Sequence, residues 1–281
     1  MAFSNRPEFN QAPARLPDGS YAEPAFDYSS RRFVARLLLA MSAAAFFGFC
    51  VWLARVDPSA LINGLPRLAA WAEKSWPPLA TGLDVYALRA LETVAIATVG
   101  TFVASLFAIP LAVLIARNTT PSAAIAYPVR WVVNGFRGID TMVFALLFVA
   151  AVGLGPFAGV LGMIVHSLGV IAKLNAEAIE TLPHPPLEAA AMSGASQAKI
   201  VSFAVIPTAM PQLASVSLYV WEANIRTSTI LGIVGAGGIG TEIKAAIDLF
   251  DFQKLLTLSL IVLVMVTIVD QVSAMVRRRL S

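Results

Sequence analysis

The stretch EAAAMSGASQAKIVSFAVIP, residues 188–207, is a polar segment between two uncharged hydrophobic runs. Pro185 and Pro186 precede it, and their fixed φ suits the first turn of a helix and excludes a helix interior. Gly194 lies where this short helix would end, because glycine tolerates the left-handed backbone of a tight turn. The chain then enters a hydrophobic run at Ile200. The sequence predicts a compact knob that docks on a partner.

The composition sets the class of protein. Of 281 residues, 58% are hydrophobic and only 13% are charged, and the mean hydropathy is +0.75. These values indicate an integral membrane protein. The net charge of +3 is small, and no basic cluster is interleaved with aromatics, so nucleic acid is not an expected partner. The single cysteine, Cys50, excludes an intrachain disulfide and a cysteine metal cluster.

Long apolar runs define the membrane spans, since a helix needs about twenty apolar residues to cross a bilayer. Five spans are expected at 37–54, 93–116, 156–175, 200–221 and 255–276. The uncharged run 141–172 is too long for one span and too short for two, so we divide it at the turn sequence GLGP, 153–156. The first half, 141–152, is too short to cross alone, so residues 131–140 must be added to it to form another span. The predicted fold is all-α, with six transmembrane helices.

The remaining segments are expected to have three different structures. Residues 1–32 lack an apolar period and are predicted to be a flexible cytosolic tail. Residues 33–89 contain the first span and an external interfacial helix with tryptophans at headgroup depth. Residues 90–281 form the core of the protein. Within the core, TSTILGIVGAGGIG, residues 227–240, is too short to cross and is expected to be re-entrant or pore-lining.

The basic residues predict the orientation. With both termini inside, twelve of the twenty lysines and arginines lie on the cytoplasmic side and seven lie outside. The opposite orientation would put Arg277, Arg278 and Arg279 outside, against the positive-inside rule. Both termini and the loop 188–207 are therefore expected in the cytoplasm.

The loop 188–207 resembles the EAA loop of ABC importer permeases. The pattern is EAA, three residues, glycine, nine residues, and then a hydrophobic pair ending in proline. The matching residues are Glu188, Ala189, Ala190, Gly194, Ile206 and Pro207. Ala204 stands where the family usually has isoleucine, which affects only a packing contact. The resemblance implies that this loop is the coupling helix, which sits in a cleft of a cytoplasmic ATPase.

A wider resemblance is to the permease subunits of phosphonate importers. It is carried by residues 153–180, 221–240 and 249–254, and extends over most of 90–279. Methionine-type permeases share something like the run ILGIVGAGGIG, which alone does not separate substrates. The resemblance implies a type I ABC importer permease in the bacterial inner membrane. Two copies would form the pathway, with two ATPase subunits inside and a substrate-binding protein outside. No cofactor or metal is expected, and no G-x-x-x-x-G-K-[ST] motif occurs here.

Polar residues within or beside the spans are the candidates for the translocation pathway, because charge in a bilayer is costly unless it is paired or hydrated. Arg137 and Asp140 are three residues apart and are expected on one helix face, either as a structural ion pair or in the pathway. Glu222 and Arg226 have i, i+4 spacing and are expected to pair near the outer surface. The other two candidates are His166, more simply a hydrogen-bonded helix contact, and Asn224.

Two further considerations concern the substrate and the glycines. An anionic substrate favours Arg226 and Arg137, because guanidinium groups match phosphonate oxygens. Gly235, Gly237 and Gly240 satisfy G-x-G-x-x-G, but position 260 is leucine, and six spans leave no room for a dinucleotide-binding sheet. These glycines are expected to allow close backbone approach, at a gate or in ordinary packing.

The predicted function is the permease subunit of an ATP-driven importer, for phosphonates or related phosphorus oxyanions, that works by alternating access. A methionine-type or other small-solute importer is the alternative. A channel or secondary transporter independent of ATP is a further one. A membrane-embedded enzyme is disfavoured, because there are only two histidines and no HExxH or G-x-S-x-G motif.

Overall fold

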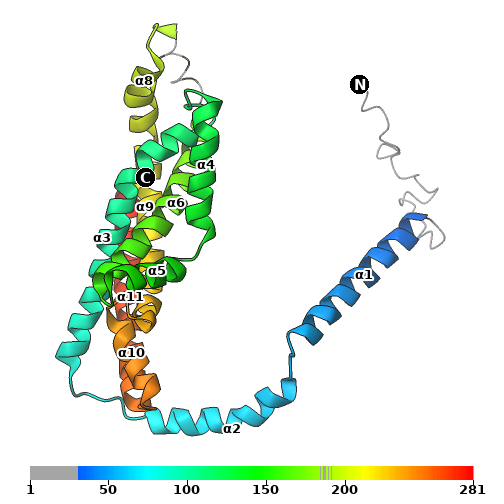
Figure 1. The fold of residues 1–281 in the computed structure, drawn as a ribbon, viewed down its shortest axis with the longest axis vertical. Helices are drawn as coiled ribbons and strands as arrows, with labels where there is room; N and C mark the ends of the chain where they lie inside the picture. The colour runs from blue at the N-terminus through cyan, green and yellow to red at the C-terminus, as the bar shows by residue number, and fades with distance from the viewer. Residues whose placement is uncertain (1–30, 184, 186–187, 189, 191, 281) are drawn as a thin grey trace, which may run out of the picture. The chain divides into compact units, whose positions relative to one another are not determined.

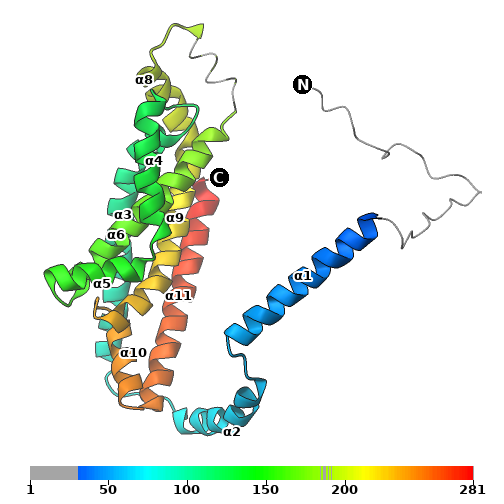
Figure 2. The same ribbon diagram turned by 45° about the vertical axis from the view of Figure 1, so that its right-hand side comes forward.

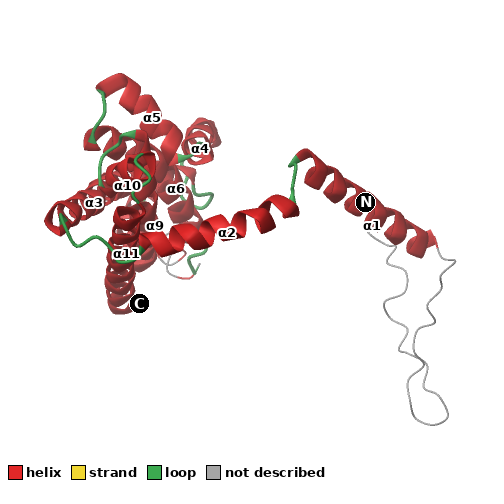
Figure 3. Cartoon of the chain, turned by 90° about the horizontal axis from the view of Figure 1, so that it is seen from below, coloured by secondary structure: helices red, strands yellow, loops and turns green. Residues whose placement is uncertain are grey.

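The computed structural model describes residues 31–280 except 184, 186, 187, 189 and 191. Every regular element in this part of the chain is helical, which confirms the predicted all-α class (Figure 3). The predicted tail lies almost entirely outside the described residues. The chain divides into two compact units, 1–66 and 67–281.

The first unit contains α1, Arg31–Leu53, and the start of α2, Pro58–Ser75. The elements of the second unit, after α2, are α3 Leu83–Ile115, α4 Ala123–Gly138, α5 Thr141–Val152, α6 Pro156–Glu180, α8 Gln197–Ile200, the π-helix η1 Val201–Val205, α9 Ile206–Leu231, the 3₁₀-helix η2 Gly232–Val234, α10 Ile239–Asp248 and α11 Phe252–Leu280 (Figure 1). The expected interfacial segment is the helix α2, none of whose residues is buried. Within the second unit, Trp71 of α2 stacks on Phe252 with ring centroids 5.5 Å apart.

Five stretches of helix are long and apolar enough to cross a membrane: Phe33–Leu53, Leu83–Ile115, Pro156–Glu180, Gln197–Val234 and Phe252–Arg279. The pair α4 and α5 makes a sixth span if the two are counted together. The six predicted spans therefore have counterparts in the described residues. Most are longer than their uncharged runs, because helices continue through charged residues that find partners.

The predicted span over residues 131–152 is wrong in shape. The helix begins earlier, at Ala123, and breaks after Gly138, and α5 is turned by 90° from α4. Figure 2 shows α5 lying across the long helices. Asp140 caps α5 by accepting a hydrogen bond from the Met142 amide at 2.8 Å. An aspartate before a helix favours an N-cap over a helix interior, which explains the break.

The predicted boundary after span five is also wrong. Helix α9 does not stop at Trp221 but continues to Leu231, so residues 227–231 belong to the long helix. Only the rest of the expected re-entrant segment is separate, as η2 and a glycine turn before α10. Glu222 and Arg226, which the helix therefore contains, pair along its surface with i, i+4 spacing.

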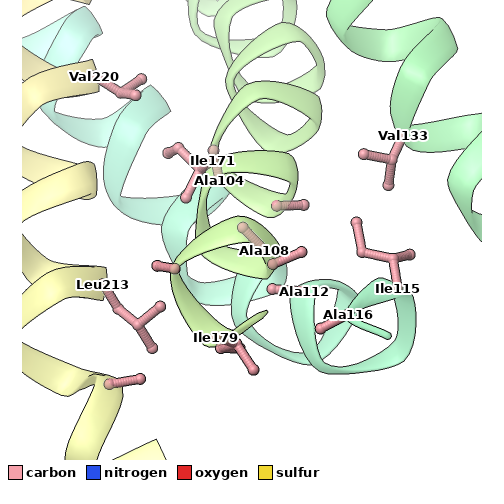
Figure 4. Packing of buried hydrophobic residues seen from close by; sticks show 14 of the residues in the cluster. Ala104, Ala108, Ala112, Ile115, Ala116, Val133, Ile171, Ile179, Leu213 and Val220 are labelled. Carbon is pink, nitrogen blue, oxygen red and sulfur yellow. The ribbon is translucent and has the colours of Figure 1, made fainter. Parts of the chain in front are cut away.

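Small residues form the contact between α3 and α6. Ala104, Ala108 and Ala112 repeat at every fourth position of α3 and are at most 1% exposed, and Ala172 and Ala176 lie in the same cluster from α6. Figure 4 shows the three α3 alanines near Ile171 and Ile179 of α6. In lipid the hydrophobic effect does not drive helices together, so close contact between small residues stabilises the pair.

Gly169 of α6 provides a test of a second close helix contact, the one between α6 and α4. A Cβ at this position would lie 2.6 Å from the Arg137 amide nitrogen and 2.8 Å from the Val133 carbonyl oxygen, both backbone atoms of α4. We expect Gly169→Ala to destabilise the protein by roughly 1–3 kcal/mol, as overpacking does. The thermal unfolding midpoint in detergent measures the effect.

The matched control is Gly135→Ala in α4, where a Cβ meets nothing within 4 Å. This change should leave the unfolding midpoint unchanged or raise it, since alanine favours a helix over glycine by about 1 kcal/mol. Equal midpoints for the two variants would contradict the close α4–α6 contact.

Candidate functional site

The coupling segment, residues 181–200, follows α6 and includes α8. Glu188, Ala190 and Met192 have helical backbone, and Gly194 has a φ of +76°. The short helix and the glycine turn are thus confirmed, while Ala189 lies outside the described residues. Glu188 is exposed and Met192 is 89% exposed, so the knob offers side chains to a partner.

A hydrogen bond joins this segment to the loop after α3: the Gln197 side chain donates to the Thr119 carbonyl at 3.1 Å. The Asn118 side chain of the same loop donates to the Ile179 carbonyl of α6 at 2.8 Å. A cavity of about 350 Å³ lies beside these bonds. Its lining residues are Asn118, Thr119, Glu188, Gln197, Ile200, Val201 and Val205. A displacement of the coupling segment therefore reaches the end of α3 directly.

A π-helix, Val201–Val205, lies at the start of the span, just before Pro207. The Ile206 amide donates to the carbonyl of Val201, five residues earlier, in place of the usual four. Pro207 has no amide hydrogen, and its ring would clash with a carbonyl four residues back. The wider π turn accommodates this proline at the point where the coupling segment joins the span. Ile206 is half-buried and Pro207 is exposed.

A buried polar contact joins the three central helices. Asn224 of α9 is 4% exposed and donates to Thr101 of α3 at 2.8 Å and to Ser167 of α6 at 2.7 Å. Thr101 and Ser167 lie near the middle of their helices. Three residues before Asn224 on α9, Trp221 donates from its indole nitrogen to the Thr98 hydroxyl of α3 at 3.0 Å. Asn224 thus fixes how α3, α6 and α9 pack.

The glycine segment after α9 packs tightly against its neighbours. Gly235 and Gly237 have positive φ, and a Cβ on Gly240 would collide with the Thr229 carbonyl oxygen. The Thr93 hydroxyl of α3 accepts a hydrogen bond from the Ile239 amide at 2.8 Å. The expected close backbone approach is confirmed, and it ties α3, α9 and α10 together at one end of the bundle.

Four charged side chains form a network on α9 and α11. Arg226 lies 3.3 Å from Glu222 and 3.5 Å from Asp270, and Arg277 lies 3.0 Å from Glu222. The predicted pair of Glu222 and Arg226 is confirmed, but it sits within α9 and not at its outer end. Asp270 and Arg277 were missed. A lone acid in the apolar run 255–276 was the available signal for Asp270.

The other pathway candidates have different surroundings. Arg137 ends α4 and Asp140 precedes α5, so the expectation that they share one helix face is wrong. No ion pair joins them among the described side chains. The Nδ1 atom of His166 lies 2.8 Å from the Ile139 carbonyl oxygen, which confirms a hydrogen-bonded helix contact. In the described part of the chain, no group of residues could hold a metal ion.

The fold and the coupling segment are those of a membrane permease, and the comparison with known proteins agrees. Residues 108–281 match the family model described as binding-protein-dependent transport system inner membrane component. The chain belongs to this family. It is a multi-pass inner-membrane permease subunit of an ABC importer, and such subunits are not enzymes and work with ATPase and substrate-binding subunits.

Two relatives come from Stutzerimonas stutzeri. The permease protein HtxC is 46% identical over 226 residues, which cover 80% of each chain. The phosphite transport system permease protein PtxC is 37% identical over 229 residues, 82% of this chain and 83% of the relative. An inward-facing structure of the MetNI methionine transporter matches with a TM-score of 0.65 at 20% identity, over 72% of this chain and all of that one. This last likeness shows the fold alone.

Proposed function

We propose that two copies of this chain form the translocation pathway of an ATP-driven importer for phosphonates, phosphite or related phosphorus oxyanions. The coupling segment, with its exposed knob and its hydrogen bond from Gln197 to the loop after α3, carries the assignment of an importer mechanism. The relative PtxC, named for phosphite transport, favours the substrate class. The alternative of a methionine-type importer has weaker support. The methionine import permease MetP of Bacillus subtilis is 31% identical over only 39% of this chain, and the MetNI structure is only 20% identical.

The mechanism follows from the contacts. An ATPase dimer that closes on ATP moves the exposed knob around Glu188. The hydrogen bond of Gln197 passes this movement to the loop after α3, and Asn118 ties this loop to the end of α6. The Asn224 contact makes α3, α6 and α9 move together. The two copies rock between inward-facing and outward-facing states, and the substrate crosses between them.

The charged network supplies groups for an anionic substrate. Arg226 and Asp270 have side chains that are 48% and 43% exposed, on helices that belong to membrane spans. A half-exposed charge within a membrane needs water or protein beside it, because lipid tails do not solvate it. We place this face of α9 and α11 against the pathway between the copies. A phosphorus oxyanion competes there with the carboxylates of Glu222 and Asp270 for Arg226.

The orientation in this scheme puts both termini and the coupling segment in the cytoplasm. The basic residues at the end of α11, Arg277, Arg278 and Arg279, favour it. Residues 90–281 act as the permease core, and the glycine segment at Gly235, Gly237 and Gly240 lies at the outer end of the bundle. Labelling of Glu188→Cys by an impermeant reagent from outside intact cells would contradict the orientation.

Uptake by proteoliposomes tests the function. The chain is reconstituted with its ATPase and binding protein, and the uptake of phosphite, methylphosphonate and methionine is compared with and without ATP. We expect ATP-dependent uptake of a phosphorus oxyanion. Competition by methionine with none by the phosphorus compounds would refute the substrate, and uptake without ATP would favour a secondary transporter.

Gln197 should affect coupling more than assembly. Gln197→Ala removes the side-chain hydrogen bond to the Thr119 carbonyl but leaves the knob in place. We expect uptake to fall about tenfold, as for a coupling loss near 1.4 kcal/mol, while ATP hydrolysis by the complex persists. The control is Lys199→Ala in the same short helix, an exposed position, which should keep normal uptake. Equal uptake by both variants would remove Gln197 from the coupling route.

A further inference from the structure

A small polar cavity, which we call the α4 cavity, lies between the end of α3, the middle of α4 and the later half of α6. Its volume is about 110 Å³. The lining residues are Ile115, Arg117, Arg130, Val133, Asn134, Lys173, Ala176 and Glu180. The cavity lies at the end of the bundle that bears the coupling segment, apart from the charged network on α9 and α11.

We propose that the α4 cavity binds a phosphate group, either the headgroup of an anionic phospholipid or free inorganic phosphate. Three cationic side chains from three different parts of the chain line it: Arg117, Arg130 and Lys173. Glu180 is the one carboxylate in the lining. Three cations held around so small a space repel one another, and an anion between them relieves this repulsion.

The backbone geometry holds two of these cations in place. Arg130 donates from Nε and Nη2 to the Ile115 carbonyl, at 3.0 and 2.6 Å, and so caps the end of α3. Its guanidinium has further N–H groups beyond these two bonds. The close approach of α4 to α6 at Gly169 brings Lys173 of α6 to the same space.

The carboxylates near the cavity cancel only part of this positive charge. Glu180 carries one negative charge against the three cations of the lining, and it accepts a hydrogen bond from the backbone amide of Arg117 at 2.8 Å. Lys173 lies 3.2 Å from Glu177, but both side chains are exposed, at 38% and 53%, and such pairs contribute little.

The chemistry of these groups selects phosphate. Guanidinium groups bind phosphate oxygens through paired, charge-assisted hydrogen bonds, and lysine adds a point charge. Basic pockets between spans on the cytoplasmic side suit anionic lipid headgroups. The proposed orientation puts the α4 cavity at that side, next to the headgroups of the inner leaflet.

A bound phosphate would also act on coupling. Arg117 lies two residues before Thr119, whose carbonyl accepts the hydrogen bond from Gln197 of the coupling segment. An anion that holds Arg117 against Lys173 would stiffen the loop after α3. The inference therefore adds a ligand-dependent control that the proposed transport cycle does not itself require.

Two binding measurements on the full-length chain test the proposal. In the first, native mass spectrometry counts the phosphatidylglycerol molecules that remain on the purified chain. In the second, inorganic phosphate is titrated into nanodiscs of phosphatidylcholine, and the thermal unfolding midpoint is recorded. Neither measurement depends on transport, so a wrong substrate or mechanism would not affect the outcome.

Variants with opposite expected effects on phosphate binding are compared in both measurements. Arg117→Gln with Lys173→Gln should weaken binding at least about tenfold, while the backbone amide that holds Glu180 remains. Glu180→Gln removes the one carboxylate of the lining and should strengthen binding. Lys199→Gln, which removes an exposed charge outside the cavity, should change nothing.

The outcomes separate the two sources of phosphate. Retained phosphatidylglycerol that is lost in the double variant identifies a lipid headgroup. A rise in the unfolding midpoint with inorganic phosphate, lost in the same variant, identifies free phosphate. The proposal is overturned if the wild-type chain responds to neither ligand, or if the double variant binds as the wild type does.

Discussion

Glu188→Lys and Gly194→Pro are each expected to reduce ATP-driven uptake to background, while the chain still inserts into the membrane. Glu188 is exposed on the knob, so its reversal changes the charge that the ATPase meets. Gly194 has a φ of +76°, whereas proline fixes φ near −65°, so the turn cannot form. Both positions lie outside the packed spans, and insertion should therefore be unaffected. Proteoliposome uptake and membrane fractionation measure the two effects.

Gly194→Ala is the control for the turn. A Cβ at this position meets nothing within 4 Å, so only the strain of the left-handed backbone opposes alanine. This strain is about 1–2 kcal/mol, and substantial uptake should remain. Normal uptake by the Glu188→Lys variant would remove the knob from the coupling mechanism.

Arg226→Leu should cause the second large loss. It removes a guanidinium that lies 3.5 Å from Asp270 and leaves that carboxylate without this partner within a span. An unpaired charge at the centre of a membrane costs about 2.5–3.5 kcal/mol, and the partial exposure of Asp270 reduces this cost. We expect lower stability together with uptake of phosphorus oxyanions at background level.

The double variant Arg226→Leu, Asp270→Leu separates a structural ion pair from a pathway role. Removing both partners should restore most of the unfolding midpoint, because no charge is left unpaired. Glu222 keeps Arg277 as its partner at 3.0 Å. If Arg226 contacts the substrate, uptake stays at background in this stable protein. Restored uptake would show that the pair only stabilises the bundle.

The elements that local sequence determines were predictable. Gly194 marked the end of the short helix, because glycine acts through its own backbone. The apolar runs indicated six spans, since the length of a span is set by the bilayer. The break between α4 and α5 was missed although Asp140 can cap a helix, because an uncharged run was extended through it.

Contacts between distant parts of the chain could not be predicted from one sequence. Asp270 lies 3.5 Å from Arg226 only because α9 and α11 run side by side in opposite directions (Figure 2). The α4 cavity likewise depends on how closely α4 approaches α6. Gly169 permits this approach, but a glycine in a sequence does not show which helix lies against it. Half of the charged network was therefore predicted, as the pair Glu222 and Arg226, and the other half, Asp270 and Arg277, was not. The coupling role of the loop 188–207 stays a prediction.

The π-helix at Val201–Val205 has a consequence for how force enters the span. Its winding differs from that of an α-helix by one residue over a single turn. Rewinding it would rotate the knob by about 100° around the axis of α9 and shift it by about 1.5 Å. A partner bound to the knob would then transmit rotation as well as translation to α9.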